Sequence, residues 1–180
     1  MRATISKVSF IAFILLAITS CSYQPEHPYR IVFLQCCHDE WRDVMNSEMK
    51  RELAFHTDVK LEIIESYSST EKQVEQVRAL AKQKIDLLII TPNEAKPLTA
   101  AIEEIYKAGI PVILVDRKTD SDLYTAFIGA DNYEIGKTAG KFIASQFKSG
   151  GNILEVQLEM TSSPATERNR GFNDAIGSSL

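Results

Sequence analysis

The stretches that decide the fold are DLLIITPN at residues 86–93 and GIPVILVDR at residues 109–117. Each is a continuous apolar run that stops abruptly at polar residues. Continuous hydrophobicity is typical of a strand covered on both faces, as in a parallel sheet flanked by helices. The residues after such a strand lie at its carboxyl end, where open α/β sheets bind their ligands. The two runs therefore predict a pocket for a polar ligand at this edge.

Strands and helices alternate along the rest of the chain. This rhythm predicts an α/β fold, an open parallel sheet with helices on both faces. The predicted strands cover residues 30–35, 60–65, 86–90, 111–115, 125–128 and 152–157. The predicted helices cover residues 40–55, the stretch from a capping box at 68–71 to residue 81, 98–108, 135–143, and the residues from about 165 onward.

The first residues have the pattern of an export signal. An apolar run from Val8 to Ala17 follows Arg2 and Lys7 and leads into small residues before Cys21. A basic start and an apolar run of this length indicate a secretory signal rather than a membrane span. The junction resembles a bacterial lipobox, which implies lipidation of Cys21 and attachment to a membrane surface. An ordinary signal peptide that happens to meet a cysteine, or an uncleaved anchor, stays open.

Composition and cysteine usage narrow the function classes. The chain has 24 acidic and 20 basic residues, for a net charge of −4. This slight acidity, without a basic cluster, argues against a nucleic-acid partner. Besides Cys21 only Cys36 and Cys37 remain, which is too few for a disulfide framework, and no spacing suggests a metal site. We expect two small residues at a strand end and no cofactor, although His38 beside them leaves a metal or Cys–His nucleophile reading open.

One motif partly resembles a nucleotide-binding site. Gly136, Lys137 and Thr138 resemble the end of a phosphate-binding loop. That pattern needs a glycine at position 131, where the chain has Asp131. No nucleophile–base pair or metal set follows a predicted strand either, so the sequence argues against an enzyme.

Polar residues follow each of the first four predicted strands, and they should meet at one rim. They lie at 35–39, 66–69, 91–93 and 116–117. Asp116 and Arg117 can form planar, charge-assisted hydrogen bonds with vicinal hydroxyls, and Trp41 can stack on the apolar face of a sugar ring. Trp41 alone fits the role of a core anchor of its helix nearly as well as that of a stacking residue. The Asp116–Arg117 pair alone fits a surface turn. Together these groups favour a sugar site.

The ordered motifs resemble the type I periplasmic binding proteins, the ribose-binding and LacI-like sugar-binding modules. The motifs are IITPN at 89–93, GIPVI at 109–113, VDR at 115–117, IGADN at 128–132 and ERNRGF at 167–172. More narrowly, QCCHDEWR at 35–42, PNEA at 92–95 and IGADNYEIG at 128–136 resemble the periplasmic sensor modules of hybrid two-component systems, which sense carbohydrate.

The resemblance implies a set of ligand contacts. Asp116 and Arg117 match the pair that holds sugar hydroxyls, and Arg168 matches an arginine of the second lobe. Asp39 and Thr91 stand where the ribose binders place asparagines, and Arg42 stands at an aromatic position. A sugar other than ribose is therefore expected. The remaining implied positions are the stacking residue Trp41, the site residue Asn93 and the hinge residue Asp131.

The resemblance also implies a domain plan. Residues 1–20 would be the signal, 21–29 a tether, 30–131 the first lobe, and 132–180 the incomplete start of a second lobe, as in a fragment of a longer product or a truncated gene. A lone strand after the hinge would lack partners. We therefore expect fraying after about Gly150 and sugar affinity weakened at least about a hundredfold.

Two functions fit this plan. The first is the periplasmic, membrane-anchored input module of a hybrid two-component receptor that senses a small sugar. Any histidine kinase activity would then reside in a longer parent. The alternative is the solute-binding lipoprotein of a sugar ABC uptake system.

Overall fold

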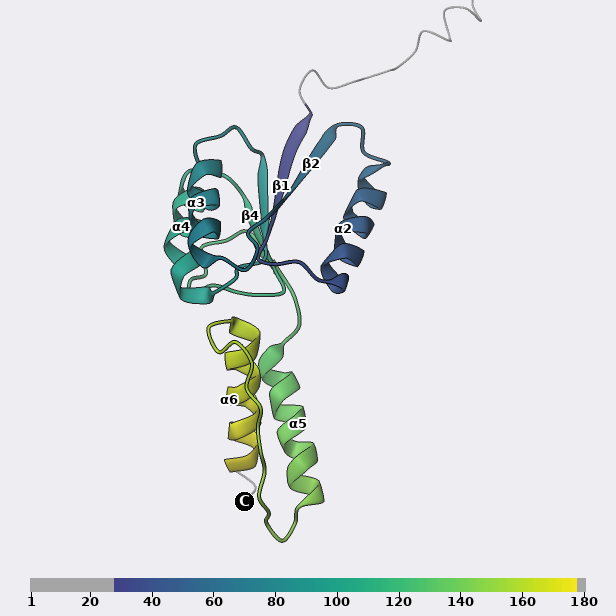
Figure 1. Ribbon diagram of the computed structural model, residues 1–180, viewed down its shortest axis with the longest axis vertical. Coiled ribbons are helices and arrows are strands. Elements are labelled where there is room, and N and C mark those ends of the chain that lie inside the picture. The colour runs from purple at the N-terminus through teal and green to yellow at the C-terminus, as the bar shows by residue number, and fades with distance from the viewer. Residues whose placement is uncertain (1–27, 178–180) are drawn as a thin grey trace, which may run out of the picture.

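A parallel sheet forms the upper part of the molecule (Figure 1). The structure is a computed structural model that describes residues 28–177, so the signal and the lipidation predicted at Cys21 lie outside the described residues. The strands are β1 (Tyr29–Gln35), β2 (Val59–Glu65), β3 (Leu87–Ile90), β4 (Val112–Val115) and β5 (Ala126–Ile128). They are all parallel, in the order β2-β1-β3-β4-β5, which confirms the predicted fold class.

Three helices cover the two faces of the sheet, with α2 (Glu40–Leu53) on one side and α3 (Thr70–Leu80) and α4 (Ala95–Lys107) on the other (Figure 1). The N-cap of α3 is Ser69, whose Oγ accepts the backbone N–H of Lys72 at 3.2 Å, so the cap lies one residue later than the predicted capping box at 68–71 and Glu71 does not occupy the third helical position. The core lies under α3 and α4, where strand and helix side chains are buried together, including Val32, Leu34, Val77, Leu88, Ile90, Leu98, Ile102, Ile105 and Leu114.

A helix pair forms the lower part of the molecule. After β5 the chain enters α5 (Asn132–Gln146), and α6 (Ser163–Gly177) packs alongside it (Figure 1). Glycines permit the close approach: a Cβ on Gly136 would meet the backbone of Arg168, and one on Gly171 would meet the backbone of Tyr133. The contact is therefore backbone against backbone.

The predicted strand at 152–157 is wrong. Residues 151–159 belong to the chain segment that connects α5 to α6. They do not pair with a strand, and their side chains are exposed. The alternating apolar side chains that suggested a strand have no neighbouring strand to pair with in residues 28–177, and a single strand gains no ladder hydrogen bonds.

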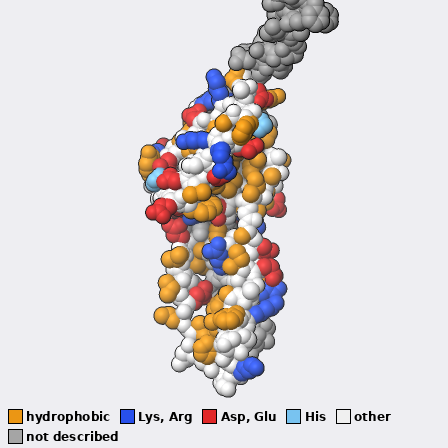
Figure 2. All heavy atoms as spheres, turned by 90° about the vertical axis from the view of Figure 1, so that its right-hand side faces the viewer, with side chains coloured by type: hydrophobic (Ala, Val, Ile, Leu, Met, Phe, Trp, Pro, Cys, Tyr) orange, Lys and Arg blue, Asp and Glu red, His pale blue; other side chains and the backbone are white. Residues whose placement is uncertain are grey.

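Hydrophobic side chains are exposed on the helical part as well as on the sheet part (Figure 2). On the helical part they come from α5 and from the segment before α6, namely Ile135, Phe142, Phe147, Leu154, Val156 and Leu158. Within residues 28–177, no helix has the length and apolar character needed to cross a membrane.

Candidate functional site

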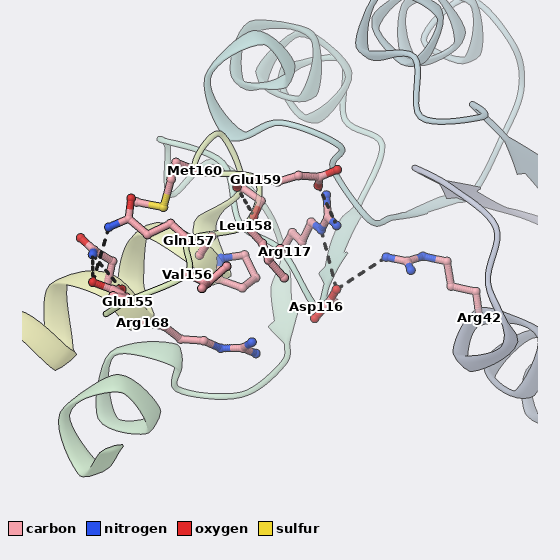
Figure 3. A pocket seen from close by; sticks show the side chains of 14 residues that line it. Arg42, Asp116, Arg117, Glu155, Val156, Gln157, Leu158, Glu159, Met160 and Arg168 are labelled. Carbon is pink, nitrogen blue, oxygen red and sulfur yellow. Dashed lines mark hydrogen bonds and ion pairs between the residues drawn. The ribbon is translucent and has the colours of Figure 1, made fainter. Parts of the chain in front are cut away.

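A cavity of about 560 Å³ lies where the carboxyl ends of the strands face the helix pair (Figure 3). The sheet part contributes Arg42, Asp116 and Arg117 to its wall. The opposite wall comes from the segment 155–160, from Ser162 just before α6, and from the α6 residues Pro164, Ala165, Arg168 and Asn169. The cavity therefore joins residues that are far apart in sequence, with charged groups on both sides.

Asp116 stands at the end of β4 in a conformation that few side chains adopt. Its φ is 65°, in the left-handed region, and its N–H donates to the carbonyl of Ile128 at 2.8 Å. Non-glycine residues in this region carry backbone strain, which tends to occur at functional positions. The turn presents the carboxylate between two guanidinium groups: Oδ2 lies 3.8 Å from Arg42 Nη2 and 3.9 Å from Arg117 Nε.

Arg117 is held by the neighbouring loop. Its Nη1 donates to the carbonyl oxygen of Asn93 at 2.8 Å, and its Nη2 lies 3.6 Å from Glu159 Oε2 across the cavity. Asn93 is fixed in turn, because its Nδ2 donates to Thr70 Oγ1 at 2.7 Å and its N–H donates to Gln73 Oε1 at 2.8 Å. Asn93 thus positions Arg117 through its backbone, and its side chain does not line the cavity.

Arg42 is a buried cation at the cavity wall. Asp39 is the N-cap of α2: its Oδ1 accepts the N–H of Arg42 at 2.8 Å and its Oδ2 pairs with Arg42 Nη1. Arg42 Nε is buried and has no hydrogen-bond partner. Burial acts to raise the pKa of Asp39, but the hydrogen bonds and charge of Arg42 outweigh it and hold that pKa below its usual value.

Four predicted contacts lie outside the cavity lining, namely Asp39, Trp41, Thr91 and Asn93. Trp41 is 55% exposed, with Arg42 Cζ 5.6 Å from its ring centroid, so the ring stands beside the wall. Thr91 is fully buried below the rim, and its hydroxyl has no partner while its carbonyl accepts from Gln73 Nε2 at 2.9 Å. The ligand-contact roles of Trp41 and Thr91 stay predictions, as do those of Asp39 and Asn93.

Arg168 reaches the cavity from α6. Its Nε donates to Asn132 Oδ1 at 2.8 Å, which ties α6 to the first residue of α5. Asp131 caps α5, because its Oδ1 accepts the N–H of Glu134 at 3.0 Å. The predicted hinge residue is thus the point where the sheet part passes into the helix pair, and its role as a hinge stays a prediction.

The segment 155–160 belongs to the cavity wall, which the sequence did not indicate. Glu159 pairs with Arg117, and Glu155 accepts from Asn169 Nδ2 at 3.0 Å. Only the alternation of charged and apolar residues marked this stretch, and alternation indicates a strand rather than a pocket wall.

The residues described between 28 and 177 contain no group of three or more side chains suited to hold a metal ion. His38, which stood beside the cysteines as a possible ligand, has its Nε2 3.5 Å from Asp43 Oδ2.

Comparisons with known proteins find relatives among the periplasmic sugar-binding proteins. A family profile described as "Periplasmic binding protein domain" matches residues 31–179. The fructose-binding periplasmic domain of a hybrid two-component system is 50% identical in sequence, with a TM-score of 0.78, over 84% of this chain and 50% of that one. The ribose import binding protein of Escherichia coli (strain K12) is 30% identical over 64% of this chain and 39% of its own length.

The galactofuranose-binding protein of the same strain is 31% identical over 76% of this chain and 44% of its own length. The chain therefore spans two fifths to one half of the length of these relatives.

Proposed function

Because the chain belongs to the periplasmic binding protein family, we propose that it binds a small sugar in the cavity beside Asp116 and senses that sugar for a signalling receptor. The observation that carries the proposal is the carboxylate of Asp116 between Arg42 and Arg117, with Arg168 on the opposite wall. The family works in the periplasm, and its sugar-binding members are not enzymes.

The cavity offers the groups that sugar hydroxyls need. The Asp116 carboxylate can accept hydrogen bonds from two adjacent hydroxyls, while the guanidinium groups donate to their oxygens, and such charge-assisted bonds are roughly twice as strong as neutral ones. Arg117 is only 14% exposed, so its hydrogen bonds compete little with water. A few fixed polar groups in a concave wall are typical of small-molecule sites.

Fructose is the first candidate ligand. The support is the 50% identity to a domain named for fructose binding, together with the similarity to a galactofuranose-binding protein. Arg42 stands where the ribose binders have an aromatic ring, which favours a sugar other than ribose.

The sensory role also rests on similarity to the hybrid two-component domain. The second candidate is a solute-binding lipoprotein of a sugar uptake system, favoured by the similarity to ribose import proteins and by the resemblance of the junction at Cys21 to a lipobox. In either role we propose attachment to a membrane, through the lipid or through a parent receptor. Mass spectrometry of the exported protein tests the lipid: an unmodified N-terminus, or one at another residue, would exclude it.

Fluorescence of Trp41 offers a direct test of binding, since it is the single tryptophan of the chain and lies beside Arg42. Titration with fructose, ribose and galactose up to millimolar concentrations should give a saturable change for at least one of them. Asp116→Ala should weaken that binding by about 2–4 kcal/mol, or thirtyfold to a thousandfold, since it removes the carboxylate that would accept the sugar hydroxyls between Arg42 and Arg117.

Asp122→Ala is the matched control, because Asp122 is exposed and its carboxylate has no partner among the described residues. Equal affinity in the wild type and in Asp116→Ala would show that the sugar does not bind at Asp116.

A further inference from the structure

Cys36 and Cys37 lie at the carboxyl end of β1, and sugar binding gives neither thiol a role. Their Sγ atoms are 2.9 Å apart. A disulfide bond is about 2.05 Å long, so the two sulfur atoms are within about 1 Å of bonding distance. Cys36 is fully buried, whereas Cys37 is partly exposed. The family places the chain in the periplasm, an oxidising compartment in which disulfides form and persist.

We propose that the adjacent thiols of Cys36 and Cys37 are an oxidation site, at which closure to a disulfide reshapes the neighbouring pocket wall and weakens ligand binding. The site itself is independent of the proposed sugar function, and only its effect on binding rests on that function.

The burial and the raised pKa of the Cys36 thiol determine which of the two cysteines reacts first. Burial, followed by the hydrogen bond with Cys37, raises the pKa of the Cys36 thiol to about 12, so Cys36 is not the first nucleophile. Cys37 attacks an external disulfide instead, forming a mixed disulfide and releasing one thiolate. Cys36 then loses its proton and attacks Cys37 Sγ. The new bond forms as the mixed disulfide breaks, and the second thiolate leaves.

The electrons and protons of this exchange balance. The cysteine pair loses two electrons and two protons, and the external disulfide gains them as two thiols. The positive charges of Arg42 and Arg117 act to lower the pKa of Cys36, which favours its deprotonation in the second step. The two arginines of the pocket wall therefore also assist closure.

Closure must move the backbone. Neighbouring Cα atoms are about 3.8 Å apart across a trans peptide, below the 4.4–6.8 Å that unstrained disulfides span. The carbonyl of Cys36 is held by the N–H of Ser68 at 2.7 Å, so we expect the change to fall on residues 37–39. Asp39 there caps α2 and pairs with Arg42 of the cavity wall. A strained disulfide is also readily reduced, which makes the change reversible.

Intact-peptide mass spectrometry tests the oxidation site. The chain is purified under reducing conditions, incubated with oxidised glutathione, blocked with an alkylating reagent and digested with trypsin. The peptide of residues 31–42 carries both thiols and excludes Cys21. We expect this peptide to lose the mass of two hydrogen atoms, and dithiothreitol to reverse the loss. In Cys37→Ser, the matched control, the loss should not occur. A peptide that stays fully alkylated, or that carries only glutathione or an interchain bond, would overturn the proposal.

Titration of the oxidised chain tests the link to the pocket. We expect oxidation to weaken fructose binding about tenfold or more, with recovery after reduction, while Cys37→Ser keeps its affinity in the presence of oxidant. Oxidation should also shift Trp41 emission in the absence of sugar, which reports the loop movement without depending on binding. An oxidised peptide with unchanged affinity and emission would refute the link. A reduced chain that binds no sugar would contradict the proposed function, while the mass and the emission would still decide the oxidation.

Discussion

Gly171 of α6 packs directly against the carbonyl group of Tyr133 in α5, so that a Cβ at this position has no room. The obstacle is backbone, which cannot rotate away as a side chain can. Gly171→Ala should therefore separate the two helices and lower the free energy of unfolding by about 1–3 kcal/mol, the usual cost of overpacking. Urea unfolding followed by circular dichroism measures the change.

Gly177→Ala is the control for that substitution, because nothing lies within 4 Å of a Cβ built there. It should leave the stability unchanged or raise it slightly, since alanine is the better helix former. Equal stabilities of the two variants would show that α5 and α6 do not pack as described.

The charge of Asp39 should make stability depend on acidity. Its pKa is held below the usual value in the folded state, so the stabilisation is present above the unfolded pKa and is lost as the pH falls through the folded value. We expect the urea midpoint to decrease below about pH 4. In Asp39→Asn the decrease should be smaller, because asparagine keeps the helix cap without the charge. A variant curve that parallels the wild type between pH 5 and pH 2 would contradict this role.

Thr91 buries a hydroxyl group that has no hydrogen-bond partner. A buried polar group without a partner costs about 1–3 kcal/mol, and valine has nearly the same shape. Thr91→Val should therefore raise the free energy of unfolding, by about 1 kcal/mol. Thr99→Val is the comparison, since the hydroxyl of Thr99 donates to the carbonyl of Ala95 at 2.9 Å and its loss should destabilise. Thermal unfolding that ranks the two variants in the opposite order would show that the Thr91 hydroxyl does have a hydrogen-bond partner.

The sequence predicted the sheet and one side of the pocket because both depend on local patterns. Continuous apolar runs at 87–90 and 112–115 identify buried parallel strands, and the residues after them must lie at one rim. Asp116 and Arg117 were therefore predictable as neighbours in the cavity wall. Their placement follows from strand direction alone.

The opposite wall could not be predicted in the same way. Residues 152–157 alternate as a strand does, and only the absence of a pairing partner among the described residues turns them into an irregular segment. The burial of Arg42 was equally hidden, because a charged residue next to Trp41 reads as the exposed face of a helix. Its pair with Asp39 is local, but its contact with Asp116 depends on the end of β4, which only the tertiary structure brings to α2.

The pair between Arg117 and Glu159 should compete with the ligand for the same guanidinium group. Nη2 of Arg117 lies 3.6 Å from Glu159 Oε2 at the cavity wall, so a sugar oxygen that binds there must displace the carboxylate. The Glu159 side chain is 67% exposed, and exposed ion pairs are worth at most about 1 kcal/mol. Glu159→Gln should therefore tighten sugar binding only modestly, by up to about fivefold.

Glu155→Gln is the control, because Glu155 lines the same cavity but bonds to Asn169 and not to an arginine. Calorimetric titration of both variants with the same sugar measures the difference. Weaker binding in Glu159→Gln would instead make Glu159 a ligand contact, and the competition would then be excluded.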